Sequence, residues 1–139
     1  MSSLHIKNAK IINADGIVDA KEVFIEGGKI SKVGNDLKSS AKQTIDAKGR
    51  ILTPGLIDIH VHLRVPGQEY KETIETGSAA AVKGGFTTVM CMPNTKPAID
   101  NRAIVESIIN ESKRTGICNI IPIGAITKGR GDQELTDMF

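Results

Sequence analysis

Three apolar, β-branched runs separated by segments of helical spacing constrain the fold of this chain more than any other feature. The runs are LIDIHVH, FTTVMCM and CNIIPIGAI, at residues 56–62, 86–92 and 118–126. The segments between them, 70–85 and 101–116, carry apolar residues at helical spacing. This alternation predicts a parallel sheet whose strands are joined by right-handed crossovers through helices. It leaves open a doubly wound sheet or part of a β/α barrel.

The helix ends and the chain length refine this prediction. Asp100 is expected to cap the helix over 101–116, and Gly116 to end it. The last segment, ELTDMF at 134–139, resembles the first turn of another helix. The chain has 139 residues, whereas a complete barrel needs ~250. We therefore expect an α/β fold that is incomplete at this length, and a chain that is a piece of something larger.

The first part of the chain has a different pattern. Segments 4–13, 17–34 and 42–53 are rich in β-branched residues with rough period-2 alternation. The breaks between them are turn signals, at Asp15-Gly16, Gly27-Gly28, Gly34-Asn35 and Lys48-Gly49. Residues 1–53 are therefore predicted to form a small all-β unit, and residues 54–139 the β/α units.

Composition excludes several classes of function. The net charge is +2 with interspersed charges, and the chain has three Phe, one Tyr and no Trp. Neither a nucleic acid nor a membrane surface is an expected partner. No apolar run has the length of a signal peptide core or a membrane span. Cys91 and Cys118 lie apart in apolar segments, which indicates buried, reduced thiols and a cytoplasmic location.

The stretch IDIHVHLRVPG, residues 57–67, concentrates the chemistry. On a strand, Asp58, His60, His62 and Arg64 share one face, at the end where parallel α/β folds build sites. Two imidazoles about 7 Å apart along a strand can tilt onto one metal ion. Asp58 could accept a hydrogen bond from one of the imidazoles and so orient that ring. An isolated HxH also occurs by chance, because two ligands do not make a site.

The segment PGLIDIHVHLRVPGQEYKETIETGSAAAVKGGFTTVMCMPNTKP, residues 54–97, closely resembles the signature region of dihydroorotases in the amidohydrolase superfamily. The leader ending in GRILTPGLID also resembles that superfamily. The resemblance covers nearly the whole chain, but only the N-terminal part of such an enzyme. It implies the first strands and helices of a TIM-type (β/α)8 barrel, preceded by part of a small β-sandwich domain.

The same resemblance implies roles for four residues. His60 and His62 correspond to a metal-binding pair on the first barrel strand, and Arg64 and Asn94 to residues that hold a substrate carboxylate. A guanidinium fork suits a carboxylate better than lysine does. From the residues alone, the preferred interpretation of Asn94 is a turn residue in PNTKP. The implied activity is the zinc-dependent interconversion of N-carbamoyl-L-aspartate and L-dihydroorotate in pyrimidine biosynthesis, with one or two Zn²⁺ ions.

Some features depart from a complete enzyme. Val65 occupies a position where relatives usually carry an acidic residue, so local support of the loop is in question. The catalytic aspartate and the remaining metal ligands are expected beyond Phe139, so no catalytic residue is assigned here. His5 is expected on the surface, and Asp132 and Asp137 are not assigned as ligands. The 139-residue chain alone is expected to be inactive.

Two other hypotheses about the function remain open. Another cyclic amidohydrolase, of the allantoinase or dihydropyrimidinase type, would share the fold and metals, but Arg64 argues against it. A non-catalytic dihydroorotase-like scaffold for another enzyme of the pathway would have no need of the four site residues. The three parallel strands would leave an open edge and an uncovered apolar face, so we expect a homo-oligomer or packing against other chains.

Overall fold

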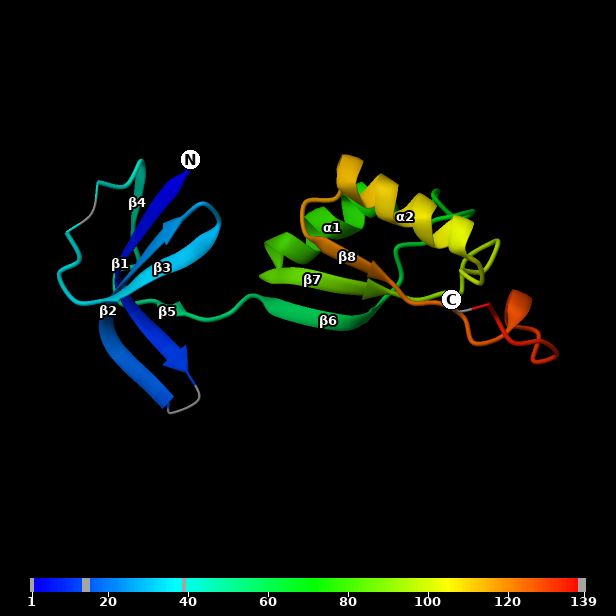
Figure 1. The fold of residues 1–139 in the computed structure, drawn as a ribbon, viewed down its shortest axis with the longest axis horizontal. Helices are drawn as coiled ribbons and strands as arrows, with labels where there is room; N and C mark the ends of the chain where they lie inside the picture. Colours follow the sequence, from blue (N-terminus) through cyan, green and yellow to red (C-terminus); the bar gives the residue numbers. More distant parts are fainter. Residues whose placement is uncertain (1, 14–15, 39, 138–139) are drawn as a thin grey trace. The chain divides into compact units, whose positions relative to one another are not determined.

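The structure is a computed structural model that describes residues 2–13, 16–38 and 40–137 (Figure 1). The chain divides into two compact units, Met1–Pro54 and Gly55–Phe139. Each unit is described by itself below. Asp15, the first residue of one predicted turn, lies outside the described residues.

The first unit is a five-stranded sheet with β1 at its centre. The strand order is β3-β2-β1-β4, and β5 also pairs with β1. β1 runs antiparallel to β2 and parallel to β4 and β5. Gly27 and Gly28 have φ of 58° and 78°, values that glycine adopts without strain, and they close the predicted hairpin between β2 and β3. The strands are β1 (Ser3–Asn13), β2 (Gly16–Glu26), β3 (Lys29–Gly34), β4 (Gln43–Asp46) and β5 (Ile51–Leu52).

His5 is buried, with only 2% of its surface exposed, so the prediction of a surface residue is wrong. Its strand has neighbours on both sides, and its Nε2 lies 3.0 Å from Oε2 of Glu22. The same carboxylate oxygen accepts a hydrogen bond from the backbone N–H of Leu37 at 2.8 Å. The ring of His5 also packs edge-on against Phe24. A buried imidazole needs such a partner, and Glu22 supplies it from the neighbouring strand.

The second unit has the predicted β-α-β-α-β order. Its three strands are parallel, with order β6-β7-β8, which confirms the parallel sheet. α1 packs against β7, α2 packs against β8, and the two helices contact each other. Figure 1 shows both helices on the same face of this sheet. The elements are β6 (Leu56–Val61), α1 (Ile74–Lys83), β7 (Phe86–Cys91), α2 (Arg102–Thr115), β8 (Asn119–Pro122) and a short 3-10 helix, Lys128–Arg130.

Side chains cap both helices at their N-termini. Thr73 accepts a hydrogen bond from the backbone N–H of Thr76, whose hydroxyl in turn accepts from the backbone of Thr73. α2 is capped by Asn101, whose side-chain oxygen accepts from the N–H of Ile104 at 3.1 Å. The prediction that Asp100 caps α2 is therefore wrong by one residue. Asp100 instead accepts a hydrogen bond from the backbone N–H of Gly129, which holds the pKa of its carboxyl below the usual value.

The core of the second unit joins the sheet and helices to two loops. Val89 and Cys91 come from β7, and Ile74 and Ile108 from the helices; the loop residues Leu63 and Ile99 complete the buried cluster. Burial raises the pKa of the Cys91 thiol. Cys91 and Cys118 are both free, the first buried and the second half-buried. The loops after β6 and β7 are thus anchored in the core at the end of the sheet that carries the candidate site.

The described end of the chain is not helical, so the helix predicted to start in 134–139 is not seen over residues 134–137. The backbone there pairs with the preceding segment instead. Leu135 forms an isolated antiparallel bridge with Thr127, and the N–H of Thr136 donates to the carbonyl of Ile126 at 2.9 Å. Within the part of the chain that the structure describes, no helix has the length and apolar character needed to cross a membrane.

Candidate active site at the carboxyl ends of β6 and β7

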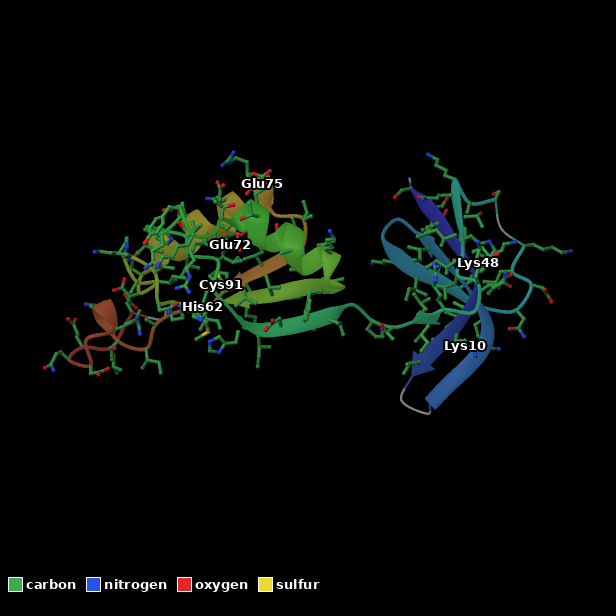
Figure 2. The ribbon with its side chains drawn as sticks, turned by 180° about the vertical axis from the view of Figure 1, so that it is seen from behind. Lys10, Lys48, His62, Glu72, Glu75 and Cys91 are labelled. Carbon is green, nitrogen blue, oxygen red and sulfur yellow. The ribbon has the colours of Figure 1, made fainter. Side chains whose placement is uncertain are left out.

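His60 and His62 lie where β6 ends. His60 is on the strand, and His62 follows its last residue, Val61. Val61 pairs with Cys91, the last residue of β7, so the carboxyl ends of these parallel strands meet. Figure 2 shows His62 beside this end of the sheet, close to the labelled Cys91. This is the end at which parallel α/β folds place their sites.

The strict alternation predicted for residues 57–64 holds only in part. Val61 and Leu63 pack on the core, as the pattern predicts. Ile57 and Ile59 are 63% and 68% exposed. β6 is an edge strand, and its pairing with β7 shifts register between Asp58 and Val61. The apolar side of β6 is therefore only half covered by the described residues.

The imidazoles of His60 and His62 lie side by side. Their ring centroids are 5.3 Å apart, with an angle of 69° between the ring planes. Asp58 does not contact either ring through a hydrogen bond in this arrangement; its Oδ1 accepts from the backbone N–H of His60 at 3.0 Å. That bond supports the strand where the register shifts.

Asn94 contacts the His62 ring directly. Its Oδ1 lies 2.9 Å from Nδ1 of His62, across a separation of 32 residues in the chain. Asn94 lies in the loop after β7, and the structure thereby brings two of the residues singled out in the sequence into contact. The amide nitrogen of Asn94 retains donor capacity for another group.

Two backbone contacts hold the loops after β6 and β7 together on either side of Asn94. The N–H of Met92 donates to the carbonyl of Val61 at 2.9 Å, and the N–H of Lys96 donates to the carbonyl of Pro66 at 3.0 Å. A Cβ at Gly67 would lie 1.8 Å from the carbonyl oxygen of Lys96. Glycine is therefore required for the two loops to approach this closely.

No role was predicted for Gly67 from the sequence, and its part in joining the two loops was missed. The Pro-Gly dipeptide that follows the HxHxR pattern one residue later is the signal that could have indicated this role. The N–H of Gly67 donates to Oε1 of Glu69 at 2.8 Å, and this bond lowers the pKa of the Glu69 carboxyl.

Arg64 and Val65 form the first part of the same loop. Arg64 has φ of 64°, in the left-handed region that non-glycine residues rarely occupy. Its carbonyl accepts from the N–H of Gln68 at 3.0 Å, which closes a turn at this point. Such backbone strain concentrates at functional sites. Val65 packs against the buried core cluster, so an apolar contact supports the loop at the position where an acidic residue was expected.

The residues present fit part of a zinc site. Two neutral imidazoles are suitable ligands, and the free edge of the His62 ring is Nε2, because Nδ1 faces Asn94. Among the described residues, no group of three or more His, Cys, Asp or Glu side chains could hold a metal ion. The described residues thus offer two candidate ligands and not a complete set.

Comparisons of sequence identify the relatives of this chain. The model of the dihydro-orotase-like family matches residues 49–139. Dihydroorotase from Trichlorobacter lovleyi is 52% identical over 98% of this chain and 32% of its own length. Dihydroorotase from Aquifex aeolicus is 48% identical over 100% of the chain and 33% of its own. The chain spans about a third of the length of these curated relatives.

Comparisons of structure give hydantoinases among other hydrolases. L-hydantoinase (dihydropyrimidinase) from Arthrobacter aurescens superposes with a TM-score of 0.85 at 26% identity, over 91% of this chain and 28% of its own. D-hydantoinase (dihydropyrimidinase) from Thermus sp. gives a TM-score of 0.74 at 32% identity, over 89% and 28%. The α/β fold agrees with these neighbours, and the family match covers most of the chain. The chain therefore belongs to the dihydro-orotase-like family.

Proposed function

We propose that the full-length protein containing this chain is a zinc-dependent dihydroorotase, which interconverts N-carbamoyl-L-aspartate and L-dihydroorotate in pyrimidine biosynthesis. The observation that carries this proposal is the arrangement of His60, His62 and Asn94 at the joined ends of β6 and β7. Arg64 follows in the same loop. The 43–52% identity to curated dihydroorotases supports the substrate.

His60 and His62 are proposed as zinc ligands. Their rings are adjacent. In the His62 ring, Nδ1 is hydrogen-bonded to Asn94, and Nε2 is directed away from that contact. Zinc, when bound, acts as a Lewis acid toward a carbonyl oxygen and makes water a better nucleophile near neutral pH. The number of ions, one or two per full-length subunit, depends on ligands outside the described residues.

Arg64 and Asn94 are proposed to bind the substrate carboxylate. A guanidinium offers two parallel N–H donors that match the two carboxylate oxygens. The amide nitrogen of Asn94 adds a further donor, because its oxygen is already engaged by His62. Two oriented donors would hold the substrate with its ring amide toward the histidines.

The chain offers no general base among the residues assigned to the site. A carboxylate from another part of the full-length protein is proposed to move the proton during ring opening and closure. The 139-residue chain alone is accordingly proposed to be inactive. Asp58 supports β6 through the backbone of His60 and is proposed to act only on the strand's geometry.

The architecture of the whole protein is also a proposal. Residues 54–139 would be the first β/α units of a TIM-type (β/α)8 barrel, and residues 1–53 part of a small β-sandwich domain. The exposed apolar residues of the edge strand β6, Ile57 and Ile59, support association of the isolated chain with itself or with other chains. We also propose that the full-length protein is cytoplasmic.

A hydantoinase-type activity is the second candidate, because the solved structures that superpose are hydantoinases and dihydropyrimidinases. Hydantoin and dihydropyrimidine rings lack the carboxylate that Arg64 would bind. The two functions therefore differ in their dependence on this residue.

The test is the replacement Arg64→Met in the full-length protein. Loss of a bidentate charge-assisted contact should cost roughly 2–5 kcal/mol of transition-state binding, or about 30-fold or more in kcat/KM for N-carbamoyl-L-aspartate. Arg102→Met is the control, because the Arg102 side chain is 85% exposed on α2 and its guanidinium pairs with Glu106, one turn further along the same helix. Unchanged kinetics of Arg64→Met would refute the substrate assignment.

A further inference from the structure

We propose that Asn94 is a positioning residue for His62, in addition to any contact with substrate. Its side-chain oxygen holds the His62 ring in the tautomer protonated on Nδ1 and leaves the Nε2 lone pair available to a metal ion. The hydrogen-bonding part of this inference stands on geometry alone. Only the link to metal binding rests on the proposed function.

The donor and acceptor roles follow from the atoms that face each other. The atom of Asn94 nearest the ring, at 2.9 Å from Nδ1, is the amide oxygen, which can only accept a hydrogen bond. With the amide in this orientation, Nδ1 is the donor. A neutral imidazole carries one N–H, so the proton on Nδ1 leaves Nε2 unprotonated. That is the state a nitrogen needs in order to bind a metal ion.

Asp58, the residue that sequence reasoning suggested for this task, is engaged elsewhere. Its Oδ1 accepts from the backbone N–H of His60 at 3.0 Å. Metal-binding histidines usually donate their second ring N–H to a carboxylate, a carbonyl or water. In this chain the side-chain carbonyl of Asn94 occupies that place at His62.

The backbone around Asn94 is fixed relative to His62. The N–H of Met92, two residues before Asn94, bonds to the carbonyl of Val61, the residue next to His62. Two residues after Asn94, the N–H of Lys96 bonds to the carbonyl of Pro66. Asparagine is short, with little rotamer freedom to lose, so this frame places its oxygen with small entropic cost.

The first test measures the tautomer directly, in the full 139-residue chain with no metal or substrate added. Two-bond ¹H–¹⁵N correlation spectra of ¹⁵N-histidine-labelled protein, at mildly alkaline pH, report which ring nitrogen carries the proton. The wild type and Asn94→Asp, which keeps an acceptor, should show His62 protonated on Nδ1. Asn94→Leu, of similar size but with no acceptor, should show a mixture of both tautomers. Asn110→Leu, at an exposed position of α2, is the matched control and should match the wild type.

The second test uses zinc alone, by competition with a chromophoric chelator in the full-length protein. Loss of such an orienting contact lowers metal affinity by roughly 10–100-fold. Asn94→Leu should show this loss, and Asn94→Asp should restore wild-type affinity. If Asn94 had a purely structural role, Asn94→Asp would not restore both the wild-type tautomer and the wild-type zinc affinity.

The outcomes separate this inference from the proposed function. His62 protonated on Nε2 in the wild type, or an unchanged tautomer in Asn94→Leu, would overturn the inference. An altered tautomer in Asn94→Leu with unchanged zinc affinity would overturn the link to metal binding, while leaving dihydroorotase activity as proposed. If the wild type bound no zinc at all, the proposed function would fail even with His62 protonated on Nδ1.

Discussion

Replacement of Gly67 by alanine tests how tightly the two site loops are joined. The added Cβ would lie 1.8 Å from the carbonyl oxygen of Lys96, and such contacts essentially never fall below 3.0 Å. The backbone must therefore move by at least 1.2 Å, the difference between these distances. Displacements of this kind in packed regions cost about 1–3 kcal/mol. The φ of 91° at Gly67 adds about 1–2 kcal/mol for any L-residue.

Gly85→Ala is the matched control, because it separates the clash from the backbone strain. Gly85 has a nearly equal φ of 88°, yet a Cβ there would meet only a side-chain carbon of Leu56 at 4.0 Å. We expect Gly85→Ala to lower the free energy of unfolding by about 1–2 kcal/mol. Gly67→Ala should lower it by about 2–5 kcal/mol, the sum of both effects.

Urea denaturation followed by circular dichroism gives the difference in the free energy of unfolding between the two variants. Because the chain has two units, amide hydrogen exchange should be read at Lys96, whose N–H bonds to Pro66 across the joined loops. The clash should speed exchange there by roughly 5–150-fold in Gly67→Ala, the equivalent of about 1–3 kcal/mol. Equal destabilisation of both variants, with Lys96 exchange unchanged, would refute this account of the loop contact.

Three further predictions concern the buried groups and acid stability. Glu22→Gln should destabilise the first unit by about 1–3 kcal/mol in urea denaturation, because the buried imidazole loses its charged partner; an unchanged midpoint would contradict this. Cys118 should react with a thiol reagent before Cys91, which is buried and should react only on unfolding; equal rates in the folded protein would show that the core is open. The hydrogen bond from Asn8 is the main cause that lowers the pKa of Asp46. The stabilisation by the ionised carboxylate should therefore be present above about pH 3.9, the unfolded pKa, and should be lost as the pH falls through the lower folded pKa. Asn8→Ala should raise the Asp46 pKa in an NMR titration, and an unaltered titration curve would count against the bond.

Local patterns in the sequence were sufficient to predict the three strands and the two α-helices of the second unit. Helical spacing, β-branched runs and glycine breaks gave the β-α-β-α-β order, because these signals act over a few residues. The cap at Asn101 rather than Asp100 shows the limit, since both residue types cap helices well. Asp100 accepts instead from Gly129, a contact that depends on tertiary structure.

The errors in the prediction come from contacts between distant segments. His5 is buried because β1 is central in its sheet, and its partner Glu22 lies on another strand. Leu135 pairs with Thr127 instead of starting a helix. In the site, the pattern marked His62 and Asn94 separately. Their hydrogen bond requires the register of β6 against β7, which no local pattern encodes.

The most direct test of the central claim is a turnover assay of the full-length protein with L-dihydroorotate and with hydantoin, alongside a measurement of bound zinc. We predict reversible conversion of L-dihydroorotate to N-carbamoyl-L-aspartate, zinc bound in stoichiometric amount, and little hydrolysis of hydantoin. Hydrolysis of hydantoin without turnover of L-dihydroorotate, or a protein that purifies without zinc and turns over neither compound, would contradict it.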